Sequence, residues 1–386
     1  MKALHTVLWG LFCACSWTWC IGMYLPILLM ERWAWPGFAV FLIANVVGCA
    51  AFGYIVRTPA RSERMIRDHA PAMVGFSVVA IAFHLFFITY LFTDIVRLDA
   101  NRTLPLLAAI GVYVVASGLS WLGDRAWLVL AVVTYTASMW LIAGCGGETR
   151  ALERIAGWNQ PETLLMMLPV LVAGFWCCPR LDLTFHRALQ RSPSRHAFLV
   201  FGVAFAVLVA GTLFIWRGPE DLAVVRLGAA HLLAQSVFTV GAHLREIRLV
   251  PASGGAPARS VVLLIPLLAI MLLPAFKSIV SGVLRPGEDL YIRFFVFYGL
   301  IFPAYVMAFM TSDASGAPRP RGWIILVMVV MLLAPIYEIG FIHERYAWML
   351  VPTGIAAAWL VMRRRVAPWG MKAPVDEATG AGSNGS

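Results

Sequence analysis

The amino-acid sequence predicts an all-α, polytopic transmembrane helical bundle. Of the 386 residues, 61% are hydrophobic and 13% are charged, whereas a soluble domain carries about a quarter charged residues. The mean hydropathy is +0.80, and apolar runs of about 20 residues, the length that crosses a bilayer core, recur along the chain. Most of the 30 basic residues fall in every second loop, and this pattern predicts the orientation in the membrane.

We expect about twelve spans, because that many apolar runs approach the length of one crossing. They lie near residues 6–30, 35–56, 72–96, 103–122, 126–145, 163–179, 197–216, 222–243, 260–284, 290–311, 322–341 and 346–362. The positive-inside rule then places both termini of this multi-pass protein in the cytoplasm, and we expect a bacterial-type inner membrane. The net charge of +10 follows from this topology, so the expected partner is the lipid bilayer and not nucleic acid.

Residues 1–366 are predicted to form one transmembrane domain, and the Gly- and Ala-rich residues 367–386 are predicted to be a disordered cytoplasmic tail. The sixth span enters the membrane from the side opposite to the first. Residues 1–145 and 160–311 can therefore be two halves of a 5+5 inverted repeat, with residues 322–362 adding two helices. Such repeats are typical of secondary transporters, whose solute lies between broken helices near the bilayer midplane.

The first span contains a predicted helix break at Gly22–Pro26. Glycine loosens a helix, and Pro26 lacks an amide donor and clashes with the carbonyl four residues earlier. The freed carbonyls could bind a cation or a substrate amine. An ordinary proline kink is the alternative.

The sixth span contains a second predicted break, at Gly174–Pro179. Its apolar part is short for a full crossing, and continuing through Leu183 and Phe185 restores the length and brings Asp182 near a cavity. The alternative is that the span ends at Pro179 and a basic cytoplasmic loop follows.

The eighth span carries a polar stripe. His231, Gln235, Thr239 and His243 recur at every fourth residue, with Ser236 alongside, so they share one helical face. A polar face toward lipid is costly, so this stripe is predicted to face protein or water. Hydrogen bonding between helices is the alternative to a ligand site.

Other ionisable residues within spans are functional candidates by default. His84 lies midway along the third span. Lys277 lies within the ninth span, and Glu338 and Asp94 are its possible partners. The seven cysteines lie in or near spans, so no external disulfide framework, resident metal or cofactor is expected.

Four segments carry a resemblance to a known family: WCIGMYLP at 19–26, CPRLDLTFHRA at 178–188, AQSVFTVGAHLRE at 234–246 and FYGLIFPAYV at 297–306. With the order of the breaks, the chain resembles the leucine-transporter-type (LeuT) fold of the amino acid–polyamine–organocation superfamily. Within it, the chain is similar to sodium:solute symporter-related bacterial membrane proteins of undefined substrate.

The resemblance implies alternating access, with a small organic solute bound between spans 1, 3, 6 and 8 and coupled to sodium or a proton. Trp17, Trp19 and Tyr90 would gate or stack on the solute. The other candidate solute-binding residues are Gly22, His84, Asp182, His231 and Gln235. A sodium ion would be held by backbone carbonyls near Cys20 and Met23 together with the side chains of Ser236 and Thr239.

Two other classes of function stay open, although we expect a transporter and not an enzyme. A membrane-bound lipid-linked transferase could use His343 and Glu344 as acid–base groups. A sensory or scaffold protein could keep a transporter fold without transport. Metal transport is a lesser variant, suggested by His84, His231 and His243.

Overall fold

The computed structural model describes residues 1–95, 103–145, 161–213, 215, 222–250, 288–310 and 320–366. Within these ranges the chain forms helices and helical turns, without a strand. Seven of the helices are long and apolar enough to cross a membrane, and three shorter apolar helices accompany them. The predicted all-α membrane architecture is confirmed at this level. The predicted span 260–284, with Lys277, and the predicted tail 367–386 lie outside the described residues, as does the side chain of Asp94.

The longer helices are α1 (Lys2–Trp17), α2 (Cys20–Ala50), α4 (Pro59–Tyr90), α5 (Thr103–Leu119), α6 (Asp124–Gly144), α8 (Pro161–Cys177), α9 (Leu183–Arg191), α10 (Ala197–Thr212), α11 (Leu222–Leu249), α13 (Glu288–Phe309), α14 (Pro320–Tyr337) and α15 (Leu350–Val366). The short elements are the α3 helix (Phe52–Ile55), the π-helical turns η1 (Leu91–Ile95) and η3 (Glu338–Ile342), and the 3₁₀ turns η2 (Cys178–Leu181) and η4 (Tyr346–Met349).

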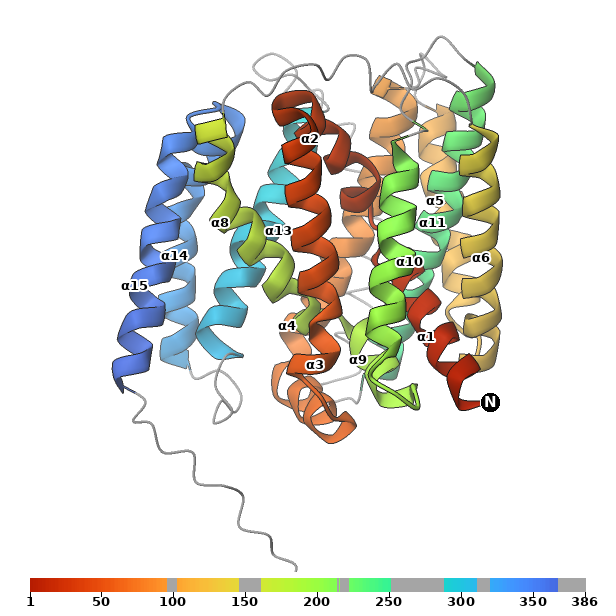
Figure 1. Ribbon diagram of the computed structural model, residues 1–386, viewed down its shortest axis with the longest axis horizontal. Helices are drawn as coiled ribbons and strands as arrows, with labels where there is room; N and C mark the ends of the chain where they lie inside the picture. Colours follow the sequence, from red (N-terminus) through yellow and green to blue (C-terminus); the bar gives the residue numbers. More distant parts are fainter. Residues whose placement is uncertain are drawn as a thin grey trace, which may run out of the picture.

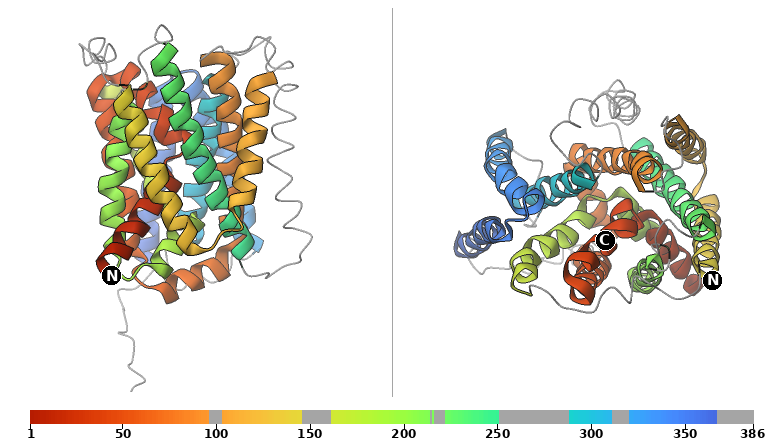
Figure 2. Two further views of the ribbon diagram at one scale, coloured as in Figure 1. Left: turned by 90° about the vertical axis from the view of Figure 1, so that its right-hand side faces the viewer. Right: turned by 90° about the horizontal axis from the view of Figure 1, so that it is seen from above.

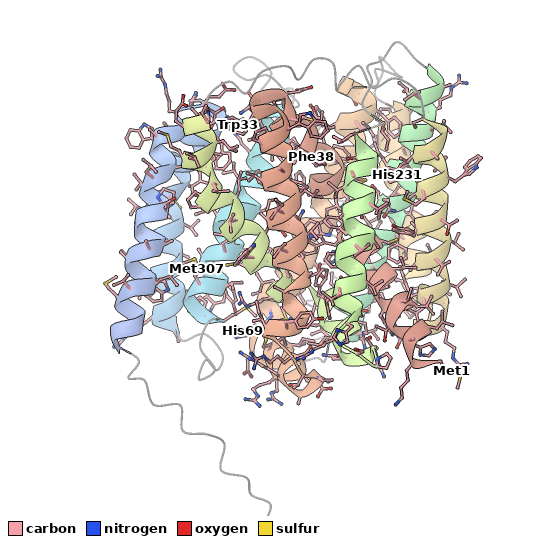
Figure 3. All side chains as sticks on the ribbon, viewed as in Figure 1. Met1, Trp33, Phe38, His69, His231 and Met307 are labelled. Carbon is pink, nitrogen blue, oxygen red and sulfur yellow. The ribbon has the colours of Figure 1, made fainter. Side chains whose placement is uncertain are left out.

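Most of the long helices run side by side along one direction, and the N-terminus and the end of α15 lie at the same end of the bundle (Figure 1). Figure 3 shows Met1 and His69 near this end and Trp33 near the other. Helix α1 packs against α6, α10 and α11, whereas α13 packs against α8 and α14. Seen from above, α14 and α15 lie at the edge of the bundle (Figure 2).

Large apolar side chains point outward from the peripheral helices. On α14, Ile324, Met328 and Met331 are at least 60% exposed, and on α6 Val129 and Trp140 are 63% and 72% exposed. In water such a surface would be an aggregation hazard, whereas in a bilayer it contacts lipid without cost. The exposed faces therefore fit a membrane-embedded bundle.

Helix α2 contains a reversal that separates two of the predicted spans. Trp33 and Ala34 leave helical geometry, and Ala34 has a φ of 51°. The Trp33 indole donates to the Thr163 hydroxyl of α8 at 2.7 Å, which holds the turn against a neighbouring helix. A single hydrogen-bonded element thus covers the second half of the first predicted span and the second span.

The first helix break does not lie at Gly22–Pro26, so the predicted position is wrong. Both residues lie inside α2 with helical geometry, and the interruption lies earlier, where Thr18 and Trp19 join α1 to α2. Pro26 is accommodated without a break in helical dihedrals. The side chains around Thr18 decide the position, as described below.

The second predicted break exists but is displaced from Gly174. Helix α8 includes Gly174 and ends at Cys177, the turn η2 follows, and Asp182 is extended with a ψ of 110° before α9 begins. Helix α9 buries Leu183, Phe185 and other side chains within the bundle. The residues after Pro179 are therefore helical and not a loop, whereas the apolar span itself ends at Leu181, close to the end that this alternative gave it.

The contact between α1 and α10 requires a glycine. A Cβ atom on Gly10 would lie 2.6 Å from the Val200 Cβ and 2.8 Å from the Ala197 carbonyl oxygen, whereas a Cβ on Gly111 of α5 would meet nothing within 4 Å. We expect Gly10→Ala to lower the free energy of unfolding in detergent by about 1–3 kcal/mol, because the two helices must separate. Gly111→Ala should raise it by up to about 1 kcal/mol. Equal effects in thermal unfolding would contradict this assignment.

Candidate functional site at two helix breaks

Side chains supply the hydrogen bonds that end α1. The last carbonyls of a helix have no backbone partner within it. Here the Thr18 hydroxyl donates to the Ala14 carbonyl at 2.6 Å, the Trp19 indole donates to the Ser16 carbonyl at 2.9 Å, and the Ser16 hydroxyl can donate to the Cys13 carbonyl at 3.2 Å. The sequence Ser-Trp-Thr-Trp thus stabilises an interruption at this point, which explains why the break precedes Gly22.

The two breaks meet. The hydroxyls of Ser16 and Thr184, which are 168 residues apart in the chain, lie 3.0 Å from each other. Beside them, the rings of Trp17 and Phe185 have centroids 4.9 Å apart. Asp182 begins α9, and its Oδ1 atom accepts hydrogen bonds of 2.7 Å from both the amide and the hydroxyl of Thr184. The end of α1 and the start of α9 are therefore joined by buried polar contacts.

Aromatic rings from three helices, α4, α11 and α13, surround Trp19 at the first break. The centroid of Trp19 lies 5.1 Å from that of Phe76 on α4 and 5.3 Å from that of Tyr298 on α13. The imidazoles of His84 and His243 lie 5.9 Å and 5.3 Å from the same indole. The buried break at Thr18 and Trp19 is thus surrounded by rings that include two imidazoles.

The polar stripe of α11 faces the bundle, as predicted. His231, Gln235, Ser236, Thr239 and His243 are all fully buried. Three of them contact other helices through the hydrogen bonds described next, so the stripe joins α11 to its neighbours.

The Thr239 hydroxyl donates to the Cys15 carbonyl at the end of α1, at 3.0 Å. The Gln235 amide donates to the Ser138 hydroxyl of α6 at 2.8 Å. His243 Nδ1 lies 3.1 Å from the hydroxyl of Ser77 on α4. These bonds are the interhelical contacts left open as an alternative, and they also bring the stripe to the break in α1.

Several buried polar atoms nevertheless lack a hydrogen-bond partner among the described residues. Such atoms are uncommon in folded proteins and point to water, an ion or a ligand. Those at or beside the breaks are Asp182 Oδ2, His84 Nε2, His243 Nε2, Ser236 Oγ and Gln235 Oε1, and both ring nitrogens of His231 share this property.

The other predicted site residues lie at different places. Tyr90 forms a cluster with Tyr24 and Tyr291, with its hydroxyl 3.3 Å from that of Tyr24. Tyr291 donates to the Cys20 carbonyl at 3.1 Å, so this predicted cation ligand already accepts a hydrogen bond.

Gly22 and Met23 lie in the first turn of α2, directly after the interruption. Gly22 faces the Phe205 ring of α10, and the Met23 amide donates to the Trp19 carbonyl at 3.0 Å. The structure thus brings Thr239 to α1 at Cys15, three residues before the interruption.

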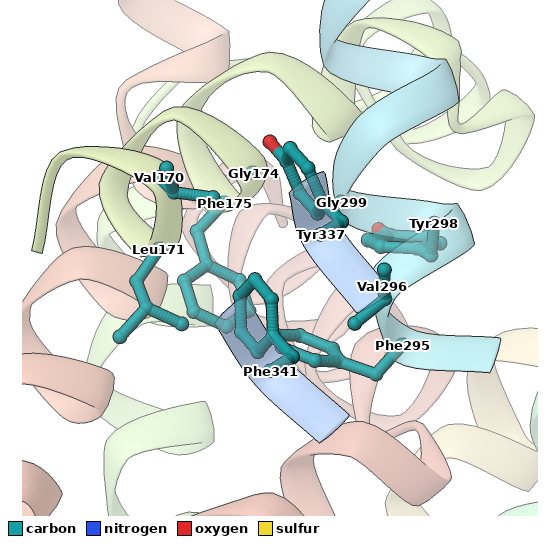
Figure 4. Close-up of a pocket in the computed structure, with 10 residues that line it drawn as sticks. All are labelled: Val170, Leu171, Gly174, Phe175, Phe295, Val296, Tyr298, Gly299, Tyr337 and Phe341. Atoms are coloured by element: carbon teal, nitrogen blue, oxygen red, sulfur yellow. The ribbon is translucent and has the colours of Figure 1, made fainter. Parts of the chain in front are cut away.

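A small cavity lies beside the ring cluster. It is lined by residues of α8, α13, α14 and η3, among them Gly174, Gly299 and Tyr298, and its lining is mainly apolar (Figure 4). Its volume is about 10 Å³, which is near the lower limit for one water molecule. Tyr298 therefore has one side toward Trp19 and another toward this cavity.

Ion pairs join helices at the end of the bundle that carries the N-terminus. Arg187 of α9 donates to Glu246 of α11 at 2.9 Å, and Arg245 donates to the same carboxylate at 2.8 Å. Arg245 also pairs with Asp124, the first residue of α6. The Arg191 Nε atom lies 3.4 Å from the Asp124 Oδ2 atom. Glu246 is 3% exposed and Arg245 4%. We call these five residues the α6–α9–α11 ion cluster.

A second group of ion pairs lies toward the opposite end. Arg32 pairs with Glu344 at 3.0 Å and with Glu288 at 3.9 Å, and it donates to the Tyr346 hydroxyl. Glu338, considered above as a partner of Lys277, pairs with Arg293 of α13. His343 is exposed next to this group.

All seven cysteines are free and buried. Within the described ranges, no group of three or more His, Cys, Asp or Glu side chains is arranged to hold a metal ion.

Sequence reasoning missed Ser16, Asn45 and Tyr298. Asn45 accepts a hydrogen bond from the Trp17 indole at 2.9 Å and is 2% exposed. A lone asparagine within an otherwise apolar span was an available signal, because such a residue must face a partner. Nothing in its local sequence distinguishes Tyr298 from other aromatic residues in spans.

Comparison with known proteins gives no match: no protein-family model, no curated protein and no solved structure is significantly similar to the chain. The resemblance to the LeuT fold stays a prediction.

Proposed function

We propose that this protein is a secondary active transporter of a small organic solute, working by alternating access with the solute bound at the paired helix breaks. The observation that carries the proposal is the contact between the breaks, where the Ser16 and Thr184 hydroxyls lie 3.0 Å apart. Interrupted helices are tolerated at membrane depth only where they are covered by protein or line a polar cavity. Two that face each other are typical of transporter sites.

Unpaired polar groups support the same site. Acceptors such as Asp182 Oδ2 and Gln235 Oε1 are buried without a donor among the residues that the structure describes, and a bound solute or ion can supply what they lack. The rings of Trp17, Trp19 and Phe76 provide an apolar wall. In this proposal His84 and His231 also face the solute path, and Tyr90 belongs to a second layer of rings.

The ion pairs fit a closed conformation of such a transporter. One group lies at each end of the bundle, and the cavity beside Tyr298 holds no more than about one water molecule. A transporter must open one end at a time, so paired charges that separate on opening are suitable closures.

The finer assignments belong to this proposal. They are about twelve spans, a 5+5 inverted repeat of the LeuT type with two further helices, cytoplasmic termini in a bacterial-type inner membrane, and cation coupling through sodium or a proton. For sodium, Thr239, Ser236 and the carbonyls near Cys20 and Met23 are the candidate ligands.

The transferase alternative draws less support from the geometry. Glu344 is held in an ion pair with Arg32, and His343 lies on the exposed surface beside it. A general acid or base needs a substrate pocket within hydrogen-bonding distance. The sensory or scaffold alternative is an outcome of the following test.

Uptake into proteoliposomes tests transport. Purified protein should accumulate at least one solute from a panel of labelled metabolites when a sodium or proton gradient is imposed. Uptake that is absent for every solute, with or without either gradient, would contradict the proposal and favour a sensory or scaffold role.

The contact between the breaks gives a sharper prediction. We expect Ser16→Ala combined with Thr184→Val to reduce gradient-driven uptake at least about tenfold, since a loss of about 1.4 kcal/mol in the closed state changes an equilibrium by that factor. The matched control is Thr353→Val on α15, whose hydroxyl bonds, within the described part of the chain, only to the Met349 carbonyl of the preceding turn. Equal uptake by both variants would show that the contact has no part in transport.

A further inference from the structure

Asp182 is a buried carboxyl group without a cationic partner among the described residues. Its side chain belongs to a fully buried residue between η2 and α9, and its Oδ2 atom has no hydrogen-bond partner. The carboxylates of Glu246 and Glu338, by contrast, are each paired with arginine. A buried carboxyl group without a cation is costly when ionised and costs much less when protonated.

The groups that face Asp182 offer no compensating charge. The titratable side chains near it are Cys13 of α1, Cys49 of α2, Cys178 of η2, Tyr298 of α13 and Glu246 of α11. Thiols and a phenol are neutral at neutral pH, and Glu246 is an acid already bound to arginine. Soft sulfur atoms are also poor ligands for hard cations such as sodium.

A chain of hydroxyl groups connects this carboxyl to the other break. When Asp182 is ionised, the Thr184 hydroxyl donates to Oδ1, and the Ser16 hydroxyl has one hydrogen to share between Thr184 and the Cys13 carbonyl. When Asp182 is protonated on Oδ1, it can donate to the Thr184 oxygen. Thr184 then donates to Ser16, and Ser16 donates to the Cys13 carbonyl, so each hydroxyl hydrogen has an acceptor.

We propose that Asp182 is the proton-binding residue that couples solute movement to a proton gradient, with Thr184 and Ser16 transmitting its protonation to the end of α1. The inference rests on the proposed transport function. In the step, a proton from water forms an O–H bond on the Asp182 carboxylate, which loses its charge. The two hydroxyl groups rotate, and only hydrogen bonds are exchanged. The reverse step returns the proton to water on the other side.

Protonation changes how tightly the breaks are joined. The ionised form leaves the Ser16 hydrogen shared between two acceptors, whereas the protonated form connects Asp182, Thr184, Ser16 and the Cys13 carbonyl in one direction. The protonated state therefore favours the closed contact between α1 and α9, and loss of the proton weakens it. Proton binding at Asp182 would then accompany closure of the α1–α9 contact around the solute.

Infrared spectroscopy of the purified protein tests the proton site without a substrate. Between about pH 5 and about pH 9, the wild type should show a carboxylic-acid C=O band that disappears as pH rises and that is missing in Asp182→Asn. Asparagine keeps the acceptor oxygen for Thr184. The control Glu338→Gln should keep the band. A wild-type spectrum without a titrating band assigned to Asp182 would overturn the inference.

If Asp182→Asn does not fold, Thr184→Val gives an independent answer. This change removes the hydroxyl that contacts the carboxyl and keeps the carboxyl itself, so the acid band should remain and shift in frequency. An unchanged band would place the titrating carboxyl elsewhere and overturn the inference.

Proteoliposomes connect the proton site with coupling. With the metabolite panel, an acidic exterior should drive accumulation in the wild type, and Asp182→Asn should lose this response to pH. Uptake driven by sodium alone, and kept by Asp182→Asn, would overturn proton coupling and leave transport standing. If no panel solute is taken up, the transport function fails, and the infrared titration still decides whether Asp182 binds a proton.

Discussion

Replacing Glu246 by alanine is expected to lower the free energy of unfolding by about 3 kcal/mol, because it removes the buried carboxylate that pairs with the mostly buried guanidinium of Arg187. Glu246 is the only acidic partner that Arg187 has within the described part of the chain, and it binds Arg245 as well. Arg245 would keep Asp124, so most of the penalty falls on Arg187. Thermal or denaturant unfolding in a mild detergent measures the change.

The control for this prediction is an exposed carboxylate. Glu288 lies 3.9 Å from Arg32, and its side chain is 43% exposed, against 4% for that of Glu246. Solvent screening limits such a pair to about 0–1 kcal/mol, so Glu288→Ala should change stability little. A Glu246→Ala protein no less stable than Glu288→Ala would show that the α6–α9–α11 ion cluster does not contribute to the free energy of unfolding.

The fold class could be predicted from the sequence because the hydrophobic effect acts on whole segments. Apolar length and loop charge need no knowledge of which helices touch. The burial of the α11 stripe follows in the same way, because a run of polar residues on one face, such as Gln235 and Thr239, cannot face lipid at low cost. Both expectations depend only on the spacing of residues along the sequence and on the apolar character of the lipid.

The position of the first break could not be predicted from glycine and proline. A proline removes one hydrogen bond and can be absorbed in a long helix, as Pro26 is. The observed interruption depends on side-chain donors. The Thr18 hydroxyl and the Trp19 indole donate hydrogen bonds to carbonyls at the end of α1. Those same residues can also sit in an intact helix, so local sequence leaves both outcomes open.

The contacts that join the breaks are tertiary, and they were beyond sequence reasoning for a different reason. Nothing near Ser16 specifies Thr184 as its partner 168 residues later. The pairing of Arg293 with Glu338 is of the same kind: both residues carry a charge within an apolar run, but charge alone does not choose between partners. Recognising a stranded polar residue was possible, whereas assigning its partner required the packed structure.

The largest functional effect is expected from opening the α6–α9–α11 ion cluster. Arg187→Ala removes the ion pair that joins the middle of α9 to Glu246 of α11, so the half of the bundle near the N-terminus should open more often. If the closed state loses about 3 kcal/mol, the population of open molecules rises about 10²-fold, because each 1.4 kcal/mol is a factor of ten. Cys13 and Cys15, fully buried beside the break, report this opening.

Labelling with a maleimide measures it, since a buried thiol reacts only when the structure opens locally. Peptide-level mass spectrometry should find Cys13 and Cys15 modified about 10²-fold faster in Arg187→Ala than in the wild type. Cys145, buried at the far end of α6, should keep its rate. The matched control Arg195→Ala removes an exposed arginine that stacks on Tyr54 and should change neither rate. Acceleration at Cys145 as well would mean global unfolding, and no acceleration anywhere would mean that the cluster does not close the path to the breaks.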